Sequence, residues 1–247
     1  MGCGVRPWRR VALVCEDSIE YVVLSLAVLS LRATIVPVSP SLSATEQETL
    51  FERMGVHYVL RPPAEADAAG PGETLHLGAH RFAVIARGSA PDPDDEYRRL
   101  EPAFIRFSSG TTGASKGVLL SHKAIIDRTA AANRGLKITS DDTILWVLSM
   151  NYHFVVTILL FLREGATIVL AGSEMPRGLI RALSTERITF IYAAPFHYRL
   201  MSSAADITAG MLTAVRAAVS TAMALPESVS QSFKAKYGFQ LSPAYGI

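Results

Sequence analysis

The prediction of the fold starts from the stretch Phe107-Ser108-Ser109-Gly110-Thr111-Thr112-Gly113-Ala114-Ser115-Lys116-Gly117. It contains five hydroxyl side chains, three glycines and one lysine. Glycines let successive backbone N–H groups point at one anion, hydroxyls donate hydrogen bonds to it, and lysine adds a mobile positive charge. The composition therefore predicts a loop that binds polyphosphate. A flexible surface turn is the alternative, and the position between two expected strands favours the phosphate loop.

The expected strands beside this loop are Ala103–Phe107 and Val118–Leu120, and Ser121 is placed to cap a helix that runs to about Leu136. A Walker loop would carry Gly-Lys followed by Ser or Thr, whereas Lys116 is followed by glycine. A simple P-loop kinase or GTPase is therefore disfavoured.

Strands and helices alternate before the loop. Ser43 and Glu46 have the Ser-x-x-Glu spacing of a capping box, ahead of a helix that ends near Gly55. The other elements expected there are a strand at Val11–Cys15, a largely buried helix at Asp17–Arg32, and strands at Thr34–Val38, His57–Leu60 and Arg81–Ala86. This alternation predicts a parallel sheet. Residues 61–78 and 89–96 are rich in Pro, Ala, Gly and Asp and are expected to be loops.

The same alternation continues after the loop. The expected strands are Thr143–Leu148, Thr167–Leu170, Thr189–Ala193, Ala214–Val219 and Phe239–Leu241, and the expected helices are Phe154–Arg163, Arg177–Thr185, Phe196–Ser203 and Pro226–Tyr237. We therefore expect an α/β fold of two stacked lobes with mostly parallel sheets flanked by helices. The expected division is an N-terminal lobe at 1–88, a linker at 89–101 and a nucleotide-binding lobe at 102–247.

Composition restricts the class of partner. The 247 residues are 49% hydrophobic and 19% charged, which suits a packed core. A net charge of +2 favours neither nucleic acid nor an anionic membrane as the main partner. The apolar runs are about half the length of a membrane span, and two cysteines without close spacing suit a reducing cytoplasm. Four histidines, His57, His76, His80 and His122, have no metal-ligand spacing, so no metal site is expected from them.

The segment Ser108–Gly117 resembles the signature loop of the adenylate-forming superfamily, which includes acyl-CoA synthetases, luciferases and peptide-synthetase adenylation domains. That loop reads Ser-Gly-Thr-Thr-Gly-x-Pro-Lys-Gly, and Ser115 replaces its proline. Three further segments follow in the family's order: Ala27–Val38, Ser220–Pro226 and Ser242–Ile247. The resemblance covers nearly the whole chain and implies the large N-terminal domain of such enzymes.

The resemblance also implies a nucleotide site. The residues expected to hold the phosphates of ATP are Ser108, Ser109, Gly110, Thr111, Thr112, Gly113, Lys116 and Gly117. Those expected at the adenine are Ser220, Thr221, Ala222, Tyr245 and Gly246, with Thr221 in place of a usual glycine. In the family a glutamate helps to hold Mg²⁺. That glutamate, the ribose-binding aspartate and the lysine of a mobile C-terminal domain are not among these residues, so weak turnover by this chain alone is expected.

The acyl side of the site is expected around Met150–His153. His153 takes the place of an aspartate that pairs with an amino group in amino-acid adenylation domains, which favours an acid without that group. It would gate the approach of the carboxylate as a catalytic residue, and the alternative is a histidine with an ordinary role at a helix start. His153, Ala194 and Phe196 are the expected acyl-pocket residues, although aromatic residues near a strand end also serve as core.

The function implied is ATP-dependent activation of a carboxylic acid to an acyl-adenylate, with coenzyme A or a carrier-protein thiol as acceptor. Two alternatives stay open. One is a non-catalytic nucleotide-binding or acyl-binding module, completed by a partner or not. The other is an amino-acid adenylation domain, against which His153 counts.

Overall fold

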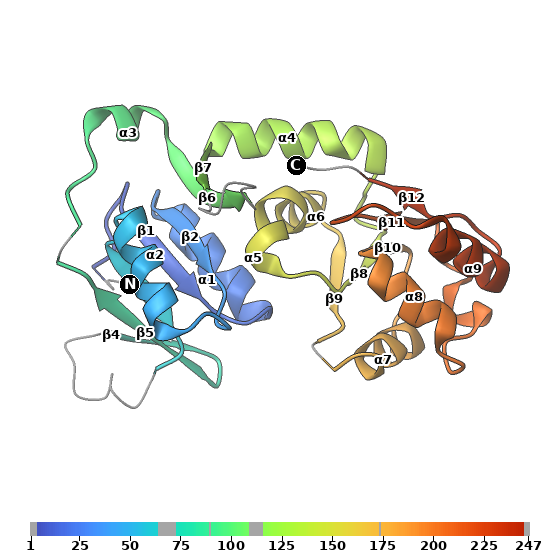
Figure 1. The fold of residues 1–247 in the computed structure, drawn as a ribbon. Coiled ribbons are helices and arrows are strands. Elements are labelled where there is room, and N and C mark those ends of the chain that lie inside the picture. Colours follow the sequence, from blue (N-terminus) through green and yellow to red (C-terminus); the bar gives the residue numbers. More distant parts are fainter. Residues whose placement is uncertain (1–3, 64–72, 89, 109–115, 173, 245–247) are drawn as a thin grey trace. The chain divides into compact units, whose positions relative to one another are not determined.

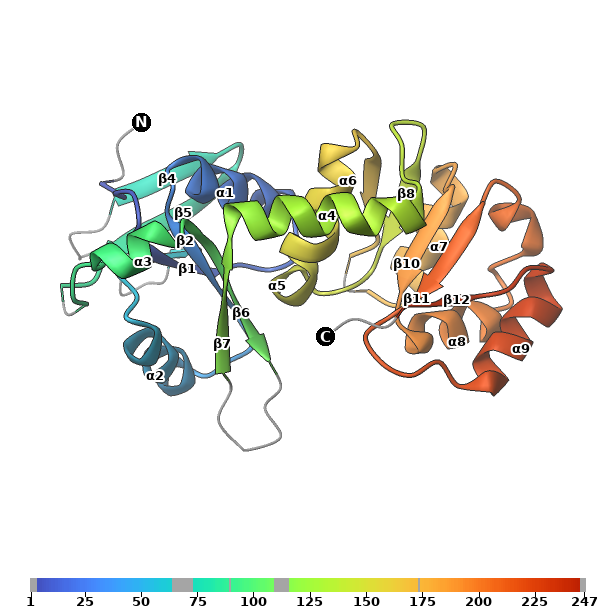
Figure 2. The same ribbon diagram turned by 90° about the horizontal axis from the view of Figure 1, so that it is seen from above.

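A computed structural model describes residues 4–63, 73–88, 90–108, 116–172 and 174–244 (Figure 1). The chain forms two compact units. The first contains Met1–Ala131 and Met150–Val156, and the second contains Ala132–Ser149 and Thr157–Ile247. Each unit has its own sheet, and the long helix α4 (His122–Leu136) carries the chain from the first unit into the second (Figure 2).

The first unit is built on a seven-stranded sheet in the order β4-β5-β3-β1-β2-β6-β7. Its strands are β1 (Arg10–Val14), β2 (Thr34–Val38), β3 (Tyr58–Arg61), β4 (Glu73–Leu77), β5 (His80–Ala86), β6 (Pro102–Ser108) and β7 (Lys116–Ser121). β3, β1, β2 and β6 run parallel, whereas β4, β5 and β7 add to the two edges as antiparallel hairpins. The predicted parallel core of this sheet is confirmed.

Two helices cover the central strands from opposite faces. Helix α1 (Ile19–Ser30) connects β1 to β2, and helix α2 (Ala44–Met54) connects β2 to β3. These two connections run across the sheet in opposite directions, because β1 lies between β3 and β2. Right-handed crossovers then place the two helices on opposite sides of the sheet. Phe51 of α2 packs with Val14, Val36 and Ile105 on one face. The predicted capping box at Ser43 and Glu46 is present, and the helix ends at Gly55 in the left-handed conformation.

The second unit has a five-stranded sheet in the order β12-β11-β10-β8-β9, in which every pairing is parallel. Its strands are β8 (Thr143–Trp146), β9 (Thr167–Leu170), β10 (Phe190–Ala193), β11 (Ala217–Ser220) and β12 (Ser242–Pro243). Its helices include α6 (Leu159–Arg163), α7 (Arg177–Thr185), α8 (Pro195–Ser203) and α9 (Glu227–Tyr237), with a 3-10 turn at Ala209–Leu212. Leu145, Ile191, Tyr198 and Phe233 are among the fully buried side chains of this core.

Several sequence-based boundaries were wrong. Within the segment expected as a loop, Glu73–Leu77 forms β4, because it pairs with β5 in a hairpin. The residues expected as a linker, 89–101, contain the whole of the short helix α3 (Asp95–Arg99), which Asp94 caps. The last strand is Ser242–Pro243 rather than Phe239–Leu241. The ends of short strands depend on which neighbour they pair with, and the local sequence does not encode that pairing.

The helix expected to be largely buried, α1, keeps one side in solvent. Tyr21, Leu24 and Val28 are buried, whereas Ile19 is 69% exposed and Leu26 is also exposed. The dense apolar pattern therefore overstated its burial. None of the helices in the described ranges is long and apolar enough to cross a membrane.

Candidate nucleotide and acyl site

The carboxyl ends of β1, β2 and β6 meet at one edge of the first sheet, because these strands are parallel. This is the edge at which ligands bind in open α/β sheets. β6 ends at Ser108 and β7 begins at Lys116, and the backbones of these two residues pair across the hairpin. The loop predicted to hold phosphate therefore connects two hydrogen-bonded strands at this edge. Its residues Ser109, Gly110, Thr111, Thr112 and Gly113, and the side chains of Ser108 and Lys116, lie outside the described part.

Gly117 has a clear packing role. A Cβ at this position would lie 2.9 Å from Cγ2 of Ile105 and 3.3 Å from the sulfur of Met54. Glycine therefore lets the base of the hairpin pack closely between its neighbouring strand and α2. The structure gives this reason for the glycine in addition to the predicted contact with phosphate.

The segment that carries His153 reaches the same edge of the first sheet. It begins as α5 (Met150–His153) and continues as a π-helical stretch (Phe154–Ile158), so the helix starts four residues before the predicted Phe154. The backbone N–H of Met150 donates a hydrogen bond of 2.7 Å to Oδ1 of Asp17, just beyond β1. The ring of Phe154 meets the ring of Tyr21 edge-on at 5.6 Å between centroids. π-helical stretches occur often at functional sites.

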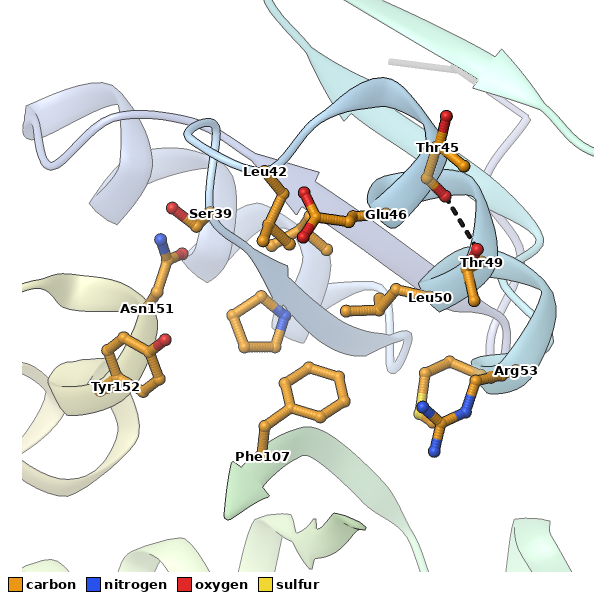
Figure 3. A pocket seen from close by; sticks show the side chains of 13 residues that line it. Ser39, Leu42, Thr45, Glu46, Thr49, Leu50, Arg53, Phe107, Asn151 and Tyr152 are labelled. Carbon is orange, nitrogen blue, oxygen red and sulfur yellow. Dashed lines mark hydrogen bonds between the residues drawn. The ribbon is translucent and has the colours of Figure 1, made fainter. Parts of the chain in front are cut away.

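A pocket of about 430 Å³ opens beside this segment (Figure 3). Its lining combines an apolar part with hydroxyl, amide and charged groups: Pro37, Val38, Leu42, Leu50, Met54 and Phe107 with Ser39, Thr45, Glu46, Thr49, Arg53, Asn151 and Tyr152. Asn151 is only 8% exposed, and its Oδ1 has no hydrogen-bond partner among the described residues. The sequence did not predict this pocket. The one pattern that could have indicated it is the expected strand at residues 34–38 followed closely by a capped helix.

His153 is half-buried in the first unit. Burial, together with the nearby positive charge of Arg106, lowers the pKa of His153 to about 4. The imidazole is therefore neutral at physiological pH. A neutral ring with so low a pKa is a poor general base, and it can donate or accept a hydrogen bond or act as a gate.

The carboxyl ends of β10, β11 and β12 lie side by side at one edge of the second sheet. Ala194 follows β10, Ser220 ends β11, and Thr221 and Ala222 follow it. The N–H of Thr221 donates to the carbonyl of Ala193 at 2.9 Å, and the N–H of Ala244 donates to the carbonyl of Ser220 at 2.7 Å. The structure thus brings Ala194, Ser220, Thr221 and Ala222 to one edge. Tyr245 and Gly246, which come shortly after β12, lie outside the described residues.

Two features of this edge are typical of a binding site. Ala222 has a φ of 71°, a left-handed backbone conformation that is costly for a residue with a Cβ. The Ser220 side chain is 1% exposed, and its Oγ has no hydrogen-bond partner in the described ranges. Strained backbone and unpartnered polar groups are concentrated at functional sites.

The aromatic residues near Ala194 divide into two groups. Tyr198 is fully buried and its hydroxyl donates to the carbonyl of Val219 at 2.8 Å, so it belongs to the core. Phe196 is 54% exposed, so it remains available for a ligand. His197 accepts a hydrogen bond from the N–H of Ala194 through Nδ1 and so caps α8. Ala194 and Phe196 belong to the second unit, whereas His153 belongs to the first.

Comparison with known proteins agrees with this geometry. A family model described as AMP-binding enzyme matches residues 1–247. A 3-[(3aS,4S,7aS)-7a-methyl-1,5-dioxo-octahydro-1H-inden-4-yl]propanoyl:CoA ligase of Mycobacterium tuberculosis is 29% identical over 274 residues, covering 99% of this chain and 53% of the relative. A 4-chlorobenzoate–CoA ligase of Arthrobacter sp. is 25% identical over 230 residues, covering 89% of this chain and 44% of the relative.

A solved malonyl-CoA ligase, in a ternary product complex with methylmalonyl-CoA and AMP bound, superposes with a TM-score of 0.78. It is 26% identical, and the match covers 96% of this chain and 52% of that one. The chain spans about half the length of the curated relatives it matches. The phosphate-loop sequence, the parallel sheets and the match over all 247 residues agree, and the chain belongs to the AMP-binding family of adenylate-forming enzymes.

Proposed function

We propose that this chain binds ATP and a carboxylic acid and takes part in forming an acyl-adenylate. The edge formed by β10, β11 and β12 carries the proposal. It brings together Ser220, Thr221 and Ala222, three of the five residues predicted to contact adenine. Ala222 there has a left-handed backbone, and the Ser220 hydroxyl has no hydrogen-bond partner among the described residues. A backbone held in a strained turn presents its N–H and C=O groups to a flat ring without rearrangement on binding.

In the proposed reaction, a carboxylate oxygen attacks the α-phosphorus of ATP. A bond forms between these two atoms, the bond from the α-phosphorus to the bridging oxygen breaks, and pyrophosphate leaves with the electron pair. Two anions must approach each other, so positive groups and N–H donors are needed around the phosphates. We assign this role to Lys116 and to the backbone of residues 108–117, with Lys116 on the β and γ phosphates.

The acid in this proposal lacks an α-amino group. By the resemblance of Met150–His153 to the family's segment, His153 takes the place of the anion that an amino-acid-activating relative would need. Its low pKa keeps it uncharged. A neutral ring offers no charge to an ammonium group. Two of the three relatives described above are named for ring-bearing acids joined to coenzyme A. We therefore favour such an acid over an amino acid, with coenzyme A or a carrier-bound thiol as the acceptor.

The family implies Mg²⁺ with ATP, which requires suitable oxygen ligands. Mg²⁺ prefers carboxylate oxygens together with phosphate oxygens of the substrate. Among the described residues there is no group of three His, Cys, Asp or Glu side chains arranged to hold a metal ion. We therefore assign no residue of this chain to Mg²⁺.

Carboxylate-dependent exchange of labelled pyrophosphate into ATP tests the reaction. It should be measured on the natural protein that contains these 247 residues, with a panel of aryl, bicyclic and short-chain carboxylic acids and with amino acids as a second panel. Exchange with at least one acid of the first panel is expected. MgATP binding without exchange on either panel would instead support a nucleotide-binding module, and exchange with amino acids alone would support an amino-acid adenylation domain.

The assignment of Lys116 gives a direct prediction. Lys116→Ala should weaken MgATP binding about tenfold or more, because a charge-assisted contact to phosphate is lost. Isothermal titration calorimetry measures the change. Lys123→Ala is the matched control, since Lys123 is an exposed lysine on α4 that pairs with Asp127 four residues along the helix. Equal affinity of the Lys116→Ala variant and the wild type would remove Lys116 from the phosphate site.

A further inference from the structure

Asp17 joins two parts of the first unit that are far apart in sequence: the turn after β1 and the segment that begins at Met150. Its Oδ1 accepts the N–H of Met150, 133 residues away, at 2.7 Å. Met150 is the first residue of α5, and the N–H groups of a first helical turn have no partner within the helix. A carboxylate satisfies such a donor and also interacts favourably with the positive end of the helix dipole.

The position of Asp17 is itself fixed. Ser18, the next residue, is the N-cap of α1, where its Oγ accepts the N–H of Tyr21 at 3.1 Å. The nearby Cys15, the first residue after β1, is buried. One turn therefore starts two helices, because Ser18 caps α1 while Asp17 caps α5. A side chain on a turn fixed at both ends can hold its partner in one geometry.

The partner segment needs such an anchor. Met150–Val156 belongs to the first unit, yet the chain on both sides of it belongs to the second. Inside the first unit, the ring contact between Phe154 and Tyr21 holds the later part of the segment, and the Asp17 bond holds its first residue. Between these two contacts lie Asn151 and Tyr152, which line the pocket, and His153. In Figure 3, Asn151 and Tyr152 lie on the same side of the view as Ser39.

We propose that Asp17 is a positioning residue, which fixes Asn151 and His153 for the incoming acid by holding the N-terminus of α5 against the end of β1. This inference rests on the proposed function for the identity of the ligand. The anchoring contact itself does not depend on that function. Asp17 is an exposed residue, yet the protein atoms packed around its carboxyl group raise the pKa of that group to about 6, against the opposing effect of the Met150 hydrogen bond. It is therefore ionised at neutral pH, when the bond is charge-assisted.

Three variants separate positioning from general stability. Asp17→Ala removes the acceptor, and Asp17→Asn keeps an oxygen that can accept from Met150. Glu16→Ala removes the exposed neighbouring carboxylate as the matched control. Amide hydrogen exchange over Met150–Val156 should become at least about tenfold faster in Asp17→Ala. Asp17→Asn, which keeps the acceptor but loses the charge, should lie between Asp17→Ala and the wild type, and Glu16→Ala should stay near the wild type. Unchanged exchange in Asp17→Ala would overturn the anchor, whatever the activity of the protein.

The kinetic test uses pyrophosphate exchange by the natural protein. In Asp17→Ala the KM for the acid should rise about tenfold, as expected for one lost charge-assisted hydrogen bond, with little change in the KM for ATP. Asp17→Asn should restore part of the loss, because it keeps the acceptor oxygen without the charge. Equal increases in both KM values, together with a lower melting temperature, would show a merely structural role and overturn the proposal.

Two further results keep the test interpretable. If Asp17→Ala does not fold, Asp17→Glu is used in its place. The longer glutamate side chain moves the carboxylate away from Met150, so an intermediate rise in the KM for the acid is expected. Wild-type values for both KM and hydrogen exchange in that variant would count against positioning. Absence of exchange activity in the wild type would refute the proposed function, and the hydrogen-exchange comparison would still decide the anchor.

Discussion

Ala222 has a strained backbone conformation at the proposed adenine site. Its φ of 71° belongs to the left-handed region, where Cβ crowds the following carbonyl. It comes directly after the buried Thr221, which follows the end of β11, at the edge where adenine is proposed to bind. A strained residue persists at such a position only because the structure around it determines the backbone.

The strain at Ala222 predicts the effect of glycine. Ala222→Gly should raise the free energy of unfolding by up to about 1 kcal/mol, because glycine adopts this backbone without a Cβ clash. The nearby Ala224, whose φ is not positive, is the matched control, and Ala224→Gly should lower stability by about 0.5–1 kcal/mol. Urea denaturation followed by circular dichroism measures both. A decrease of the same size in both variants would show that Ala222 is not strained.

Single residues also show which site features the sequence can predict. Ser43 and Glu46 are three residues apart, so their reciprocal capping bonds follow from local spacing. The loop sequence predicted to hold phosphate is likewise a local pattern. The anchor at Asp17 and the neutral state of His153 arise from contacts between distant parts of the chain, and no local pattern encodes them. Burial fixes the pKa of His153, and burial is a property of the fold.

At the scale of elements, α7 is positioned by a glycine. Gly178 lies in its first turn, and a Cβ there would come 1.9 Å from the carbonyl oxygen of Ala171, just after β9. The obstacle is backbone rather than a flexible side chain. The helix can therefore approach the end of β9 this closely only with glycine at this position.

This contact predicts different outcomes for two helical glycines. Gly178→Ala should lower the free energy of unfolding by roughly 2–4 kcal/mol, because backbone must shift to admit the methyl group. Gly135 lies near the end of α4, and no neighbouring atom comes within 4 Å of the position that a Cβ would take there. Gly135→Ala should therefore be neutral or stabilise by up to about 1 kcal/mol. Thermal unfolding of the two variants measures the difference, and similar melting temperatures would contradict it.

The elements themselves were largely predictable where the pattern was long and local. β2, β9 and α7 have the predicted bounds, and the predicted cap of α4 is present, with the N–H of Ala124 donating to Oγ of Ser121 at 3.1 Å. β4 was missed because its stability comes from pairing with β5. The early start of α5 was missed because the acceptor for its first N–H lies on a turn far away in sequence.

At the scale of the whole molecule, buried histidines should make stability depend on pH. Burial lowers the pKa values of His57, His122 and His197, and it lowers that of His153 to about 4. The folded chain therefore binds fewer protons than the unfolded chain between about pH 4 and pH 6.5. Stability is lost as pH falls through this range. Asp17 has the opposite effect, because its raised pKa adds stability as pH falls toward about 4.

The net prediction is a less stable protein at about pH 5 than at about pH 7, by about 1–3 kcal/mol, since several histidines outweigh one aspartate. Urea unfolding midpoints at the two pH values measure it. His153→Gln should reduce the difference, whereas the same change at the exposed His76 serves as the control and should leave it unaltered. A midpoint that is equal or higher at the lower pH would contradict the assignment.

The Met150–Val156 segment also decides how the molecule can be divided. Because this short stretch of the first unit is enclosed on both sides by chain of the second, no single break in the polypeptide separates the two units. If the gene is cut after codon 131, the N-terminal product lacks the Met150–Val156 segment of its own unit. If it is cut after codon 156, the N-terminal product also contains Ala132–Ser149 of the second unit. A single recombination event within this region therefore cannot exchange one unit for a homologue's, and the two must be inherited as one module.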